Sequence, residues 1–316
     1  MKSKSKILVV LLTIVVVGTG LLFGIYNARR KSEKALVVAT NFPAYDFARS
    51  IVGDAIEVKM LVSPGTEIHD FEPTPGDIID IKNSKLFIYN GGESENWVEE
   101  ILGNLDKDKT TLFKMMDVVD VVEEEVVEGM EVEHNHEEEE IEYDEHIWTS
   151  IKNAEKILEK LKEELERIFP EEEKRFEKNA KEYIDKLAEL DLKFQHIVEN
   201  GKRKFLVFGD RFPLRYFADD YGLDYFAAFP GCAEQTEVSS KTIAFLTDKV
   251  KSENVPVILK IELSNGEIAR TIADETGAKV LTFNTLHNIS ASDFESGRSY
   301  VEMMEENIKV LEEALN

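Results

Sequence analysis

The chain has 316 residues, about twice the length of a typical domain, so two lobes are expected. Its content of 43% hydrophobic and 9% aromatic residues is enough for folded cores and excludes a chain that is disordered throughout. The 63 Asp and Glu residues outnumber the 38 Lys and Arg residues, which gives a formal net charge of −25. This balance excludes nucleic-acid binding through a basic surface and makes a small molecule or a cation the more natural partner.

The N-terminal 34 residues have the features of an export signal. Three lysines precede an uncharged apolar run over residues 7–26, which is about 30 Å long as a helix and can span a bilayer. We expect residues 1–34 to be an uncleaved signal anchor with a spacer, and a cleaved signal peptide, leaving a secreted or periplasmic protein, is the alternative. Either outcome places most of the chain outside the cytoplasm.

Residues 35–169 are predicted to form an α/β lobe. Short apolar strands alternate with amphipathic helices, which is typical of a parallel sheet. The predicted strands are 35–40, 56–62 and 86–89, and the predicted helices are 44–53, 77–83 and 97–102. A further helix is expected from its N-cap Ser150 through residue 168, where Pro170 stops it.

An acidic stretch over residues 117–145 interrupts this alternation. It contains 15 carboxylates and no Lys or Arg, so the rest of the chain has a net charge of only −10. A run of like charges is usually a solvated loop, and this one is expected to be too acidic to pack.

One long amphipathic helix is predicted over residues 170–200, because apolar residues recur there at steps of three and four until Gly201. Alternation then returns in residues 201–316. The predicted strands there are 205–208, 225–228, 257–261 and 279–283, and the predicted helices are 214–221, 241–253, 266–276 and 300–315. The expected fold is therefore α/β, with two lobes joined by a single long helix.

The common enzyme signatures are absent from the sequence. There is no P-loop, no G-x-G-x-x-G after a strand, no G-x-S-x-G, no H-E-x-x-H and no C-x-x-C. Cys232 is the single cysteine, so no lipid-modified cysteine follows the apolar run and no intramolecular disulfide can form. We expect an inert thiol at this position rather than a soft metal ligand.

Three histidines stand where an α/β protein would build a site. His69 follows the strand predicted at 56–62, His287 follows the strand predicted at 279–283, and His146 lies between the acidic stretch and a helix. Ligands of open α/β sheets collect beyond the carboxyl ends of the strands. Three imidazoles with a nearby carboxylate suit Zn²⁺, and Mn²⁺ if more oxygen ligands join.

Four segments of this chain, in order, resemble the metal-binding solute receptors of ABC uptake transporters, the zinc and manganese group. They are FPAYDFARSIVGDAIEVKMLVSPGTEIHDFEPTPGDI, DEHIW, RYFADDYGLDY and SYVEMMEENIKVLEEAL. The resemblance covers about residues 36–316. It implies a C-clamp fold in which two Rossmann-like lobes are joined by one rigid helix. It also implies a monomer that holds one metal ion between its lobes and delivers it to a membrane permease and its ATPase.

The resemblance assigns ligands by position. His69 and His146 match the family's motifs directly. The third ligand of the family, a His or Glu, has no clean match, and Asp210 in FGDRFPLRYF is nearest, with an ion pair to Arg211 as the competing interpretation. For the fourth ligand, His287 is a better donor than Asn284.

Other polar residues receive supporting roles or none. Glu262, which follows the strand predicted at 257–261, is a candidate to accept a hydrogen bond from a ligand imidazole, although a solvated acid is the simpler interpretation. Glu234 and Glu237 are interpreted in the same way. His134 and His136 lie within the acidic stretch and form a candidate auxiliary cation site. Zinc-type members of the resembled family carry a His-bearing charged loop here, which favours zinc over manganese.

These inferences lead to one principal hypothesis. The chain is expected to be a membrane-anchored extracytoplasmic receptor that captures Zn²⁺ between its lobes without catalysing a reaction, with Mn²⁺ as the alternative cargo. Two other functions remain as rivals. One is a zinc hydrolase with Glu262 or Asp210 as the base. The other is a surface adhesin in which the metal site is vestigial.

Overall fold

The structure, a computed structural model, describes residues 36–66, 68, 71–103, 105–106, 108–130, 142–233 and 238–316. The predicted signal anchor lies outside the described residues. So do His69, His134, His136, Glu234 and Glu237. Within the part of the chain that the structure describes, no helix is long and apolar enough to cross a membrane.

The N-terminal lobe is built on a four-stranded parallel sheet with the order β2-β1-β3-β4. Its elements are β1 (Leu36–Ala39), α2 (Phe42–Val52), β2 (Glu57–Met60), α3 (Pro75–Asn83), β3 (Leu86–Tyr89), α4 (Asn96–Leu102) and β4 (Thr111–Lys114). The strand β4 was not predicted, because it is a four-residue edge strand with three half-buried residues that runs directly into the acidic stretch.

Two helices of this lobe begin two residues earlier than predicted. Asn41 caps α2 by accepting from the backbone N–H of Ala44, and Thr74 forms a capping box with Asp77 at the start of α3. Both helices carry a proline in their first two positions. Proline is favoured there because its fixed φ suits a helix and its missing N–H would have no partner in the first turn.

The C-terminal lobe repeats this architecture with a parallel sheet of order β6-β5-β7-β8. Its elements are β5 (Phe205–Phe212), α7 (Arg215–Tyr221), β6 (Asp224–Pro230), α8 (Ser240–Ser252), β7 (Val257–Ile261), α9 (Glu267–Thr276), β8 (Lys279–Phe283), α10 (Ala291–Glu295) and α11 (Tyr300–Leu315). The prediction that β5 ends at Phe208 was wrong: the strand continues past a register shift between Phe208 and Arg211, so Asp210 lies within a strand.

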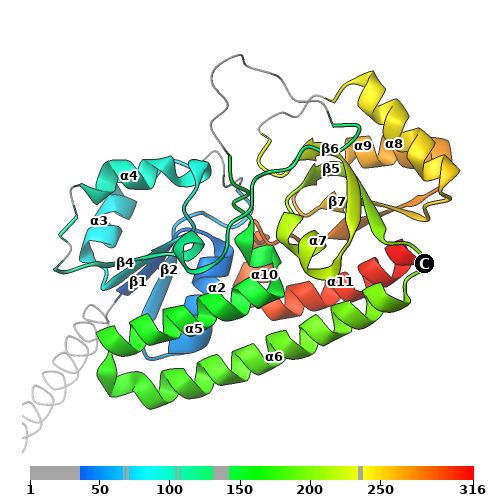
Figure 1. The fold of residues 1–316 in the computed structure, drawn as a ribbon. Coiled ribbons are helices and arrows are strands. Elements are labelled where there is room, and N and C mark those ends of the chain that lie inside the picture. Colours follow the sequence, from blue (N-terminus) through cyan, green and yellow to red (C-terminus); the bar gives the residue numbers. More distant parts are fainter. Residues whose placement is uncertain are drawn as a thin grey trace, which may run out of the picture.

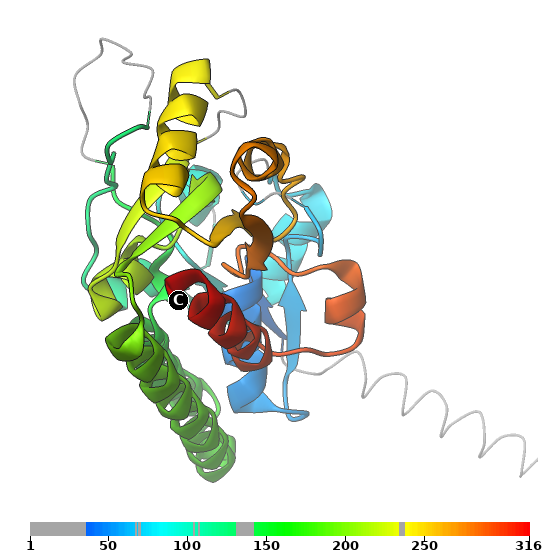
Figure 2. The ribbon, with the colours of Figure 1, turned by 90° about the vertical axis from the view of Figure 1, so that its right-hand side faces the viewer.

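A helical hairpin connects the two lobes. The helix α5 (Ile151–Ile168) ends at the Phe169–Pro170 turn, and the 28-residue α6 (Glu173–Asn200) returns antiparallel to it (Figure 1). Figures 1 and 2 show α6 passing beneath both lobes, and its buried seam packs against α2 at one end and α11 at the other. One apolar stripe therefore contacts both lobes, which makes α6 a rigid spine.

A buried carboxylate ties the spine to both lobes. Asp46 in α2 accepts hydrogen bonds from the Tyr183 hydroxyl of α6, from the Tyr300 backbone N–H that starts α11, and from Arg49. The Arg49 guanidinium also donates to the carbonyl of Arg298 at 2.5 Å. Burial raises the pKa of Asp46, although Arg49 and these donors oppose the shift.

The described ends of the acidic stretch pack on the protein, so the expectation that it is too acidic to pack was wrong for them. Most of its valines lie half-buried against the main hydrophobic core, among them Val118, Val121 and Val122, whereas Val126 is exposed. The carbonyl of Gly129 accepts from the Thr242 hydroxyl at 2.9 Å. Because valines alternate with the carboxylates here, the stretch can bury one kind of side chain and leave the other in solvent.

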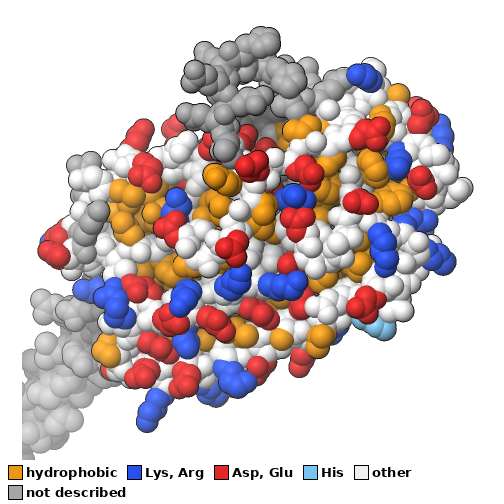
Figure 3. All heavy atoms as spheres, in the orientation of Figure 1, with side chains coloured by type: hydrophobic (Ala, Val, Ile, Leu, Met, Phe, Trp, Pro, Cys, Tyr) orange, Lys and Arg blue, Asp and Glu red, His pale blue; other side chains and the backbone are white. Residues whose placement is uncertain are grey.

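The surface elsewhere has charges of both signs. Figure 3 shows Lys and Arg interspersed with Asp and Glu on the face formed by α5 and α6. Several of these charges form ion pairs along one helix, such as Lys160 with Glu163 and Lys181 with Asp185. Such exposed pairs stabilise a helix only slightly, and the mixture resembles an ordinary soluble surface.

Candidate metal centre

His146 is buried at the point where the acidic stretch enters the helical hairpin. Its carbonyl accepts the backbone N–H and the hydroxyl of Thr149, which forms a 3₁₀ turn over Ile147–Thr149. Ser150 then caps α5 by accepting from the Asn153 N–H at 3.0 Å. The His146 side chain is fully inaccessible to solvent, so its orientation is determined by its neighbours.

Asp144 orients the His146 ring. Its Oδ1 lies 2.8 Å from the His146 backbone nitrogen and 2.9 Å from ring atom Nδ1. An ionised carboxylate can only accept, so Nδ1 carries the proton and the lone pair of the neutral ring is on Nε2. Burial lowers the pKa of His146, but the charges of Asp144, Glu145 and Glu124 and the Asp144 hydrogen bond outweigh it and raise the pKa overall.

The two residues before His146 attach this segment to opposite lobes. The Asp144 carbonyl accepts from the Tyr216 hydroxyl of α7 at 2.7 Å. The Glu145 carboxylate accepts from the Ser94 backbone N–H at 2.9 Å, and the Glu145 carbonyl accepts from Asn90 at 2.8 Å. His146 is therefore held between the lobes from both sides.

His287 lies in the loop that follows β8, where Glu262 organises the backbone. The Glu262 carboxylate accepts from the backbone N–H of Thr285 at 2.7 Å, from its hydroxyl at 3.0 Å, and from the backbone N–H of His287 at 3.1 Å. Leu286, between them, is fully buried with φ at 61°. A left-handed Leu is unfavourable and persists only where its surroundings hold it, as the Glu262 hydrogen bonds and burial do here.

Glu262 thus supports His287 through the backbone. For Glu262 the sequence favoured a solvated acid over an acceptor for a ligand imidazole, whereas its described hydrogen bonds reach two backbone N–H groups and one hydroxyl. The Thr285 hydroxyl lies 3.3 Å from His287 Nδ1 and connects Glu262 to the ring indirectly. Burial raises the pKa of Glu262, and these donors moderate the shift.

The two histidines meet between the lobes. Their ring centroids are 4.2 Å apart with the planes at 70°, and the Trp148 ring lies 5.6 Å from each of them. Trp148 also donates from Nε1 to the carbonyl of Thr285 at 2.9 Å, and its own carbonyl accepts from Tyr300. Two predicted ligand residues that are 141 positions apart in the sequence are therefore held in contact.

Asp210 is buried near the end of β5, in the C-terminal sheet that also contains β8. Its Oδ1 accepts the Arg211 backbone N–H at 2.9 Å, while the Arg211 guanidinium donates to the carbonyl of Ala233. Its Oδ2 is buried and accepts no hydrogen bond from the described residues. Asp210 and Glu262 line one cavity of about 230 Å³. Among the described residues, Asp210, His146 and His287 do not place one ligand atom each within 4.8 Å of one another.

The donor chemistry of the pair fits a borderline divalent cation. Two neutral imidazoles are ligands that Zn²⁺ prefers, and Asp144 fixes the ring of His146 as carboxylates do behind metal-bound histidines. The buried Oδ2 of Asp210, to which no described residue donates, offers a hard ligand atom in the same lobe as His287.

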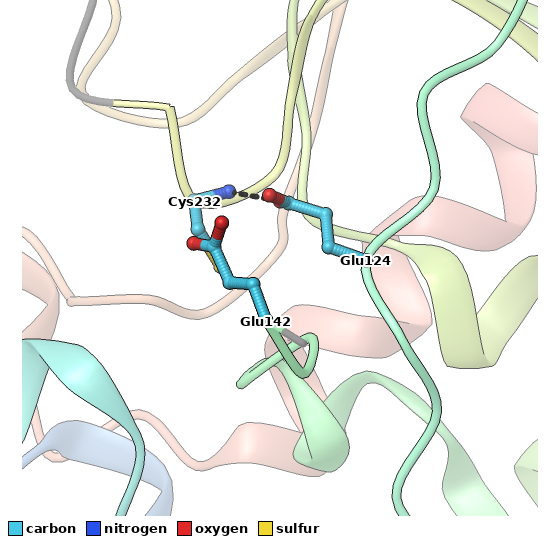
Figure 4. Close-up of side chains that lie close together, drawn as sticks. All are labelled: Glu124, Glu142 and Cys232. Atoms are coloured by element: carbon cyan, nitrogen blue, oxygen red, sulfur yellow. Dashed lines mark hydrogen bonds between the residues drawn. The ribbon is translucent and has the colours of Figure 1, made fainter. Parts of the chain in front are cut away.

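A second group of potential ligands was missed by the sequence interpretation. Glu124, Glu142 and Cys232 place one ligand atom each within 4.8 Å of one another (Figure 4). Glu124 accepts the Cys232 backbone N–H at 2.7 Å. Gly231 separates this group, here called the carboxylate–thiol cluster, from His146: a Cβ at Gly231 would lie 3.1 Å from the His146 ring.

The cluster exists because the arms of the acidic stretch pair with each other. The Glu124 N–H donates to the Glu142 carbonyl at 2.9 Å, next to an antiparallel bridge between Glu123 and Tyr143. This pairing sets Glu124 and Glu142 opposite each other, and like charges in that position repel. This pairing could not be predicted, because Glu124 and Glu142 are separated in the sequence and no alternation of apolar and polar residues marks a strand at either of them.

The ionisation of the cluster follows from partial desolvation and from the charges around it. Desolvation, followed by the charges of Glu124, Glu93 and other neighbours, raises the pKa of Glu142 to about 7. Burial and the nearby carboxylates raise the pKa of the Cys232 thiol. The thiol is therefore protonated at neutral pH, which makes it a poor nucleophile and a poor ligand in that state.

Comparison with known proteins adds an independent finding. Residues 37–314 match the family model described as "Zinc-uptake complex component A periplasmic" (ZnuA). The chain is 32% identical over 290 residues to the zinc-binding lipoprotein AdcA of Streptococcus pneumoniae, covering 91% of this chain and 57% of that relative. It is 31% identical over 299 residues to the high-affinity zinc uptake system protein ZnuA of Bacillus subtilis, covering 92% and 90%.

A solved structure has the same fold. The Zn(II)-bound ZnuA-like domain of Streptococcus pneumoniae AdcA superimposes with a TM-score of 0.73 at 29% identity, over 89% of this chain and 99% of that domain. The chain thus spans little more than half of AdcA, 57% of its length, and corresponds to its ZnuA-like domain.

Proposed function

This chain belongs to the ZnuA family of zinc-uptake components, and on that premise we propose that it is the zinc receptor of an ABC uptake transporter. The observation that carries the proposal is the contact of His146 with His287 between the lobes, with ring centroids 4.2 Å apart. The receptor captures Zn²⁺ outside the cytoplasm and passes it to a membrane permease driven by its ATPase. The names of the zinc-binding relatives support this role.

The proposed ligands are His69, His146, His287 and Asp210. His146 and His287 supply imidazole nitrogens from two segments whose rings meet between the lobes. The loop that leads to His69 is hydrogen-bonded to the loop that carries His287, because Gly65 N–H donates to the Ile289 carbonyl at 2.8 Å. The buried Oδ2 of Asp210, which accepts from none of the described residues, supports a fourth, anionic ligand.

Zinc is the proposed cargo rather than manganese. Imidazole is a borderline ligand that suits Zn²⁺, whereas Mn²⁺ favours a shell richer in oxygen. Asp144 and Glu262 hold the two histidine segments before any metal arrives, so capture requires little rearrangement of the protein. In acid a proton on Nε2 competes with the metal for the lone pair of His146, so affinity falls as the pH falls.

The family is a transport family, and we propose that the chain has no catalytic activity. A closed shell of protein ligands holds the ion without an exchangeable water, which distinguishes capture from hydrolysis. The proposed arrangement of the whole chain is an N-terminal anchor and spacer (1–34), an N-terminal lobe (35–169), the linker helix (170–200) and a C-terminal lobe (201–316), acting as a monomer. His134 and His136 form the proposed auxiliary cation site of the acidic stretch.

Titration calorimetry of the metal-free protein with zinc tests this function. Wild-type protein is expected to bind one zinc ion tightly, and H146A and H287A are expected to lose about 100-fold or more in affinity, because each removes a ligand. The matched control is H196A, which removes an exposed histidine of α6 and leaves binding unchanged. Undiminished affinity in both H146A and H287A would overturn the assignment.

A further inference from the structure

Asn288, the residue after His287, uses its whole side-chain amide in hydrogen bonds. Its Nδ2 donates to the carbonyl of Ser63 at 2.8 Å and to the carbonyl of Thr66 at 2.7 Å. Its Oδ1 accepts the backbone N–H of Ile289 at 2.8 Å. Asn288 is 1% exposed, so its amide is shielded from water, although the two acceptor residues Ser63 and Thr66 are themselves exposed. A primary amide has two N–H donors, and both are engaged here.

The two donor bonds cross from one lobe to the other. Ser63 and Thr66 lie in the loop after β2 of the N-terminal lobe, whereas Asn288 lies in the loop after β8 of the C-terminal lobe. A third bond crosses beside them, from the Gly65 N–H to the Ile289 carbonyl at 2.8 Å. Gly65 has φ at 83°, a conformation that glycine adopts without strain.

These bonds join two loops that bear proposed zinc ligands. On one side Asn288 directly follows His287, whose backbone is held by Glu262. On the other side the Ser63–Thr66 turn leads towards His69 in the sequence. Parting the lobes at this point breaks three hydrogen bonds, and the two N–H donors of the buried Asn288 amide lose their partners until water replaces them.

We propose that Asn288 is a positioning residue that ties the two ligand loops together and slows the departure of the bound metal. The inference rests on the proposed function, because it concerns the rate at which the same site releases zinc. Asn288 touches the metal at no point in this role. It acts by holding the loop of its own lobe against the loop of the other.

The substitution N288D separates this role from the local structure of the loop. Aspartate has the shape of asparagine and keeps an Oδ1 that accepts from the Ile289 N–H, but it lacks the two donors and sets a carboxylate against two carbonyls. N288S is the uncharged companion variant, because serine can still accept locally but cannot reach both carbonyls. The charge-matched control is N83D, at an exposed asparagine that ends α3.

The experiment measures zinc dissociation from each protein by stopped-flow mixing with an excess chelator. We expect N288D and N288S to release zinc about tenfold faster or more, with association changed much less, since interface changes act mainly on dissociation. N83D is expected to match the wild type. Circular dichroism of the metal-free proteins confirms that the variants being compared are folded.

The outcomes separate the two proposals. Release by folded N288D or N288S within twofold of the wild type would overturn the role of Asn288 and leave zinc capture intact. Failure of the wild-type protein itself to bind zinc would overturn the proposed function instead. If N288D does not fold, N288S decides the question by the same rate.

Discussion

Two neighbouring regions of this protein use similar residue types in opposite ways. Around His146 and His287 each supporting carboxylate meets donors: Asp144 faces an imidazole N–H, and Glu262 faces two backbone N–H groups and a hydroxyl. In the carboxylate–thiol cluster, Glu124 accepts one backbone N–H, from Cys232, but its carboxylate also lies against that of Glu142. Nearby Lys156 and Arg215 pair with other carboxylates of the acidic stretch, Asp120 and Glu125. The first arrangement fixes geometry, and the second concentrates negative charge beside it.

The carboxylates of the two regions therefore have different roles around the binding centre. Hydrogen-bonded carboxylates hold neutral ligands in place at little electrostatic cost. Unpaired carboxylates near the surface attract cations over distances up to about a Debye length. The carboxylates of Glu124 and Glu142 therefore place negative charge where it can draw a cation towards His146.

The largest effect is expected from removing the charge that orients His146. In D144N the amide oxygen can still accept from Nδ1, but the ring loses its anionic partner, and zinc affinity at pH 7.5 should fall about 10- to 100-fold. The pKa of His146 is raised in the folded protein by Asp144, so D144N lowers it and moves the acid loss of zinc binding to lower pH.

Chelator competition at several pH values measures both effects of D144N. The control is D185N, which removes an exposed carboxylate paired with Lys181 on α6. If D144N bound zinc as tightly as D185N, the Asp144 carboxylate would not be needed to orient His146 for metal binding.

A smaller effect is expected at the support of His287. In E262Q one carboxylate oxygen becomes an NH₂ group that faces a backbone N–H, so one of the bonds to Thr285 or His287 is lost. Zinc affinity should fall about tenfold, and the free energy of unfolding should fall by about 1–3 kcal/mol, the cost of a lost buried hydrogen bond.

Calorimetry and urea denaturation check this prediction. E275Q, which removes an exposed acid paired with Lys251, is the control and should change neither quantity by much. Wild-type affinity in E262Q would mean that His287 needs no support from that carboxylate.

The smallest effect is expected in the carboxylate–thiol cluster. The pKa of Glu142 is raised to about 7 in the folded protein, above its unfolded value near 4.5, so its ionisation destabilises the fold as the pH rises through this window. E142Q removes that charge. It should be more stable than the wild type at pH 8, with the gain disappearing below about pH 4.5.

Thermal denaturation of the metal-free protein across this pH range tests the sign. E163Q, at an exposed acid paired with Lys160, should show no comparable gain at pH 8. A variant E142Q that is less stable than the wild type at pH 8 would show that Glu142 is favourably partnered, contrary to the contrast drawn between the two regions.

Much of the fold follows from local sequence signals, and the failures have physical reasons. The predicted bounds of β3, β7, β8 and α11 agree with the structure, because uniform apolar runs or a clear helical period end at turn residues. The five-residue α10 was missed because it has no buried face to produce a period. The end of β5 was missed because Gly209-Asp210-Arg211 interrupts its apolar run.

The site was predictable only in its principal residues. The positions of His146 and His287 at segment ends marked them, and the structure places them together. The contributions of Tyr216, Thr285 and Asn288 could not be predicted, since each acts through a partner distant in the sequence. No local pattern encodes such pairings.

The most direct test of the account is the location of zinc in a crystal of the protein grown with one equivalent of the metal. An anomalous difference map at the zinc edge is predicted to show one strong peak about 2.0–2.1 Å from a ring nitrogen of both His146 and His287. A peak among Glu124, Glu142 and Cys232, with none between the two histidines, would contradict it.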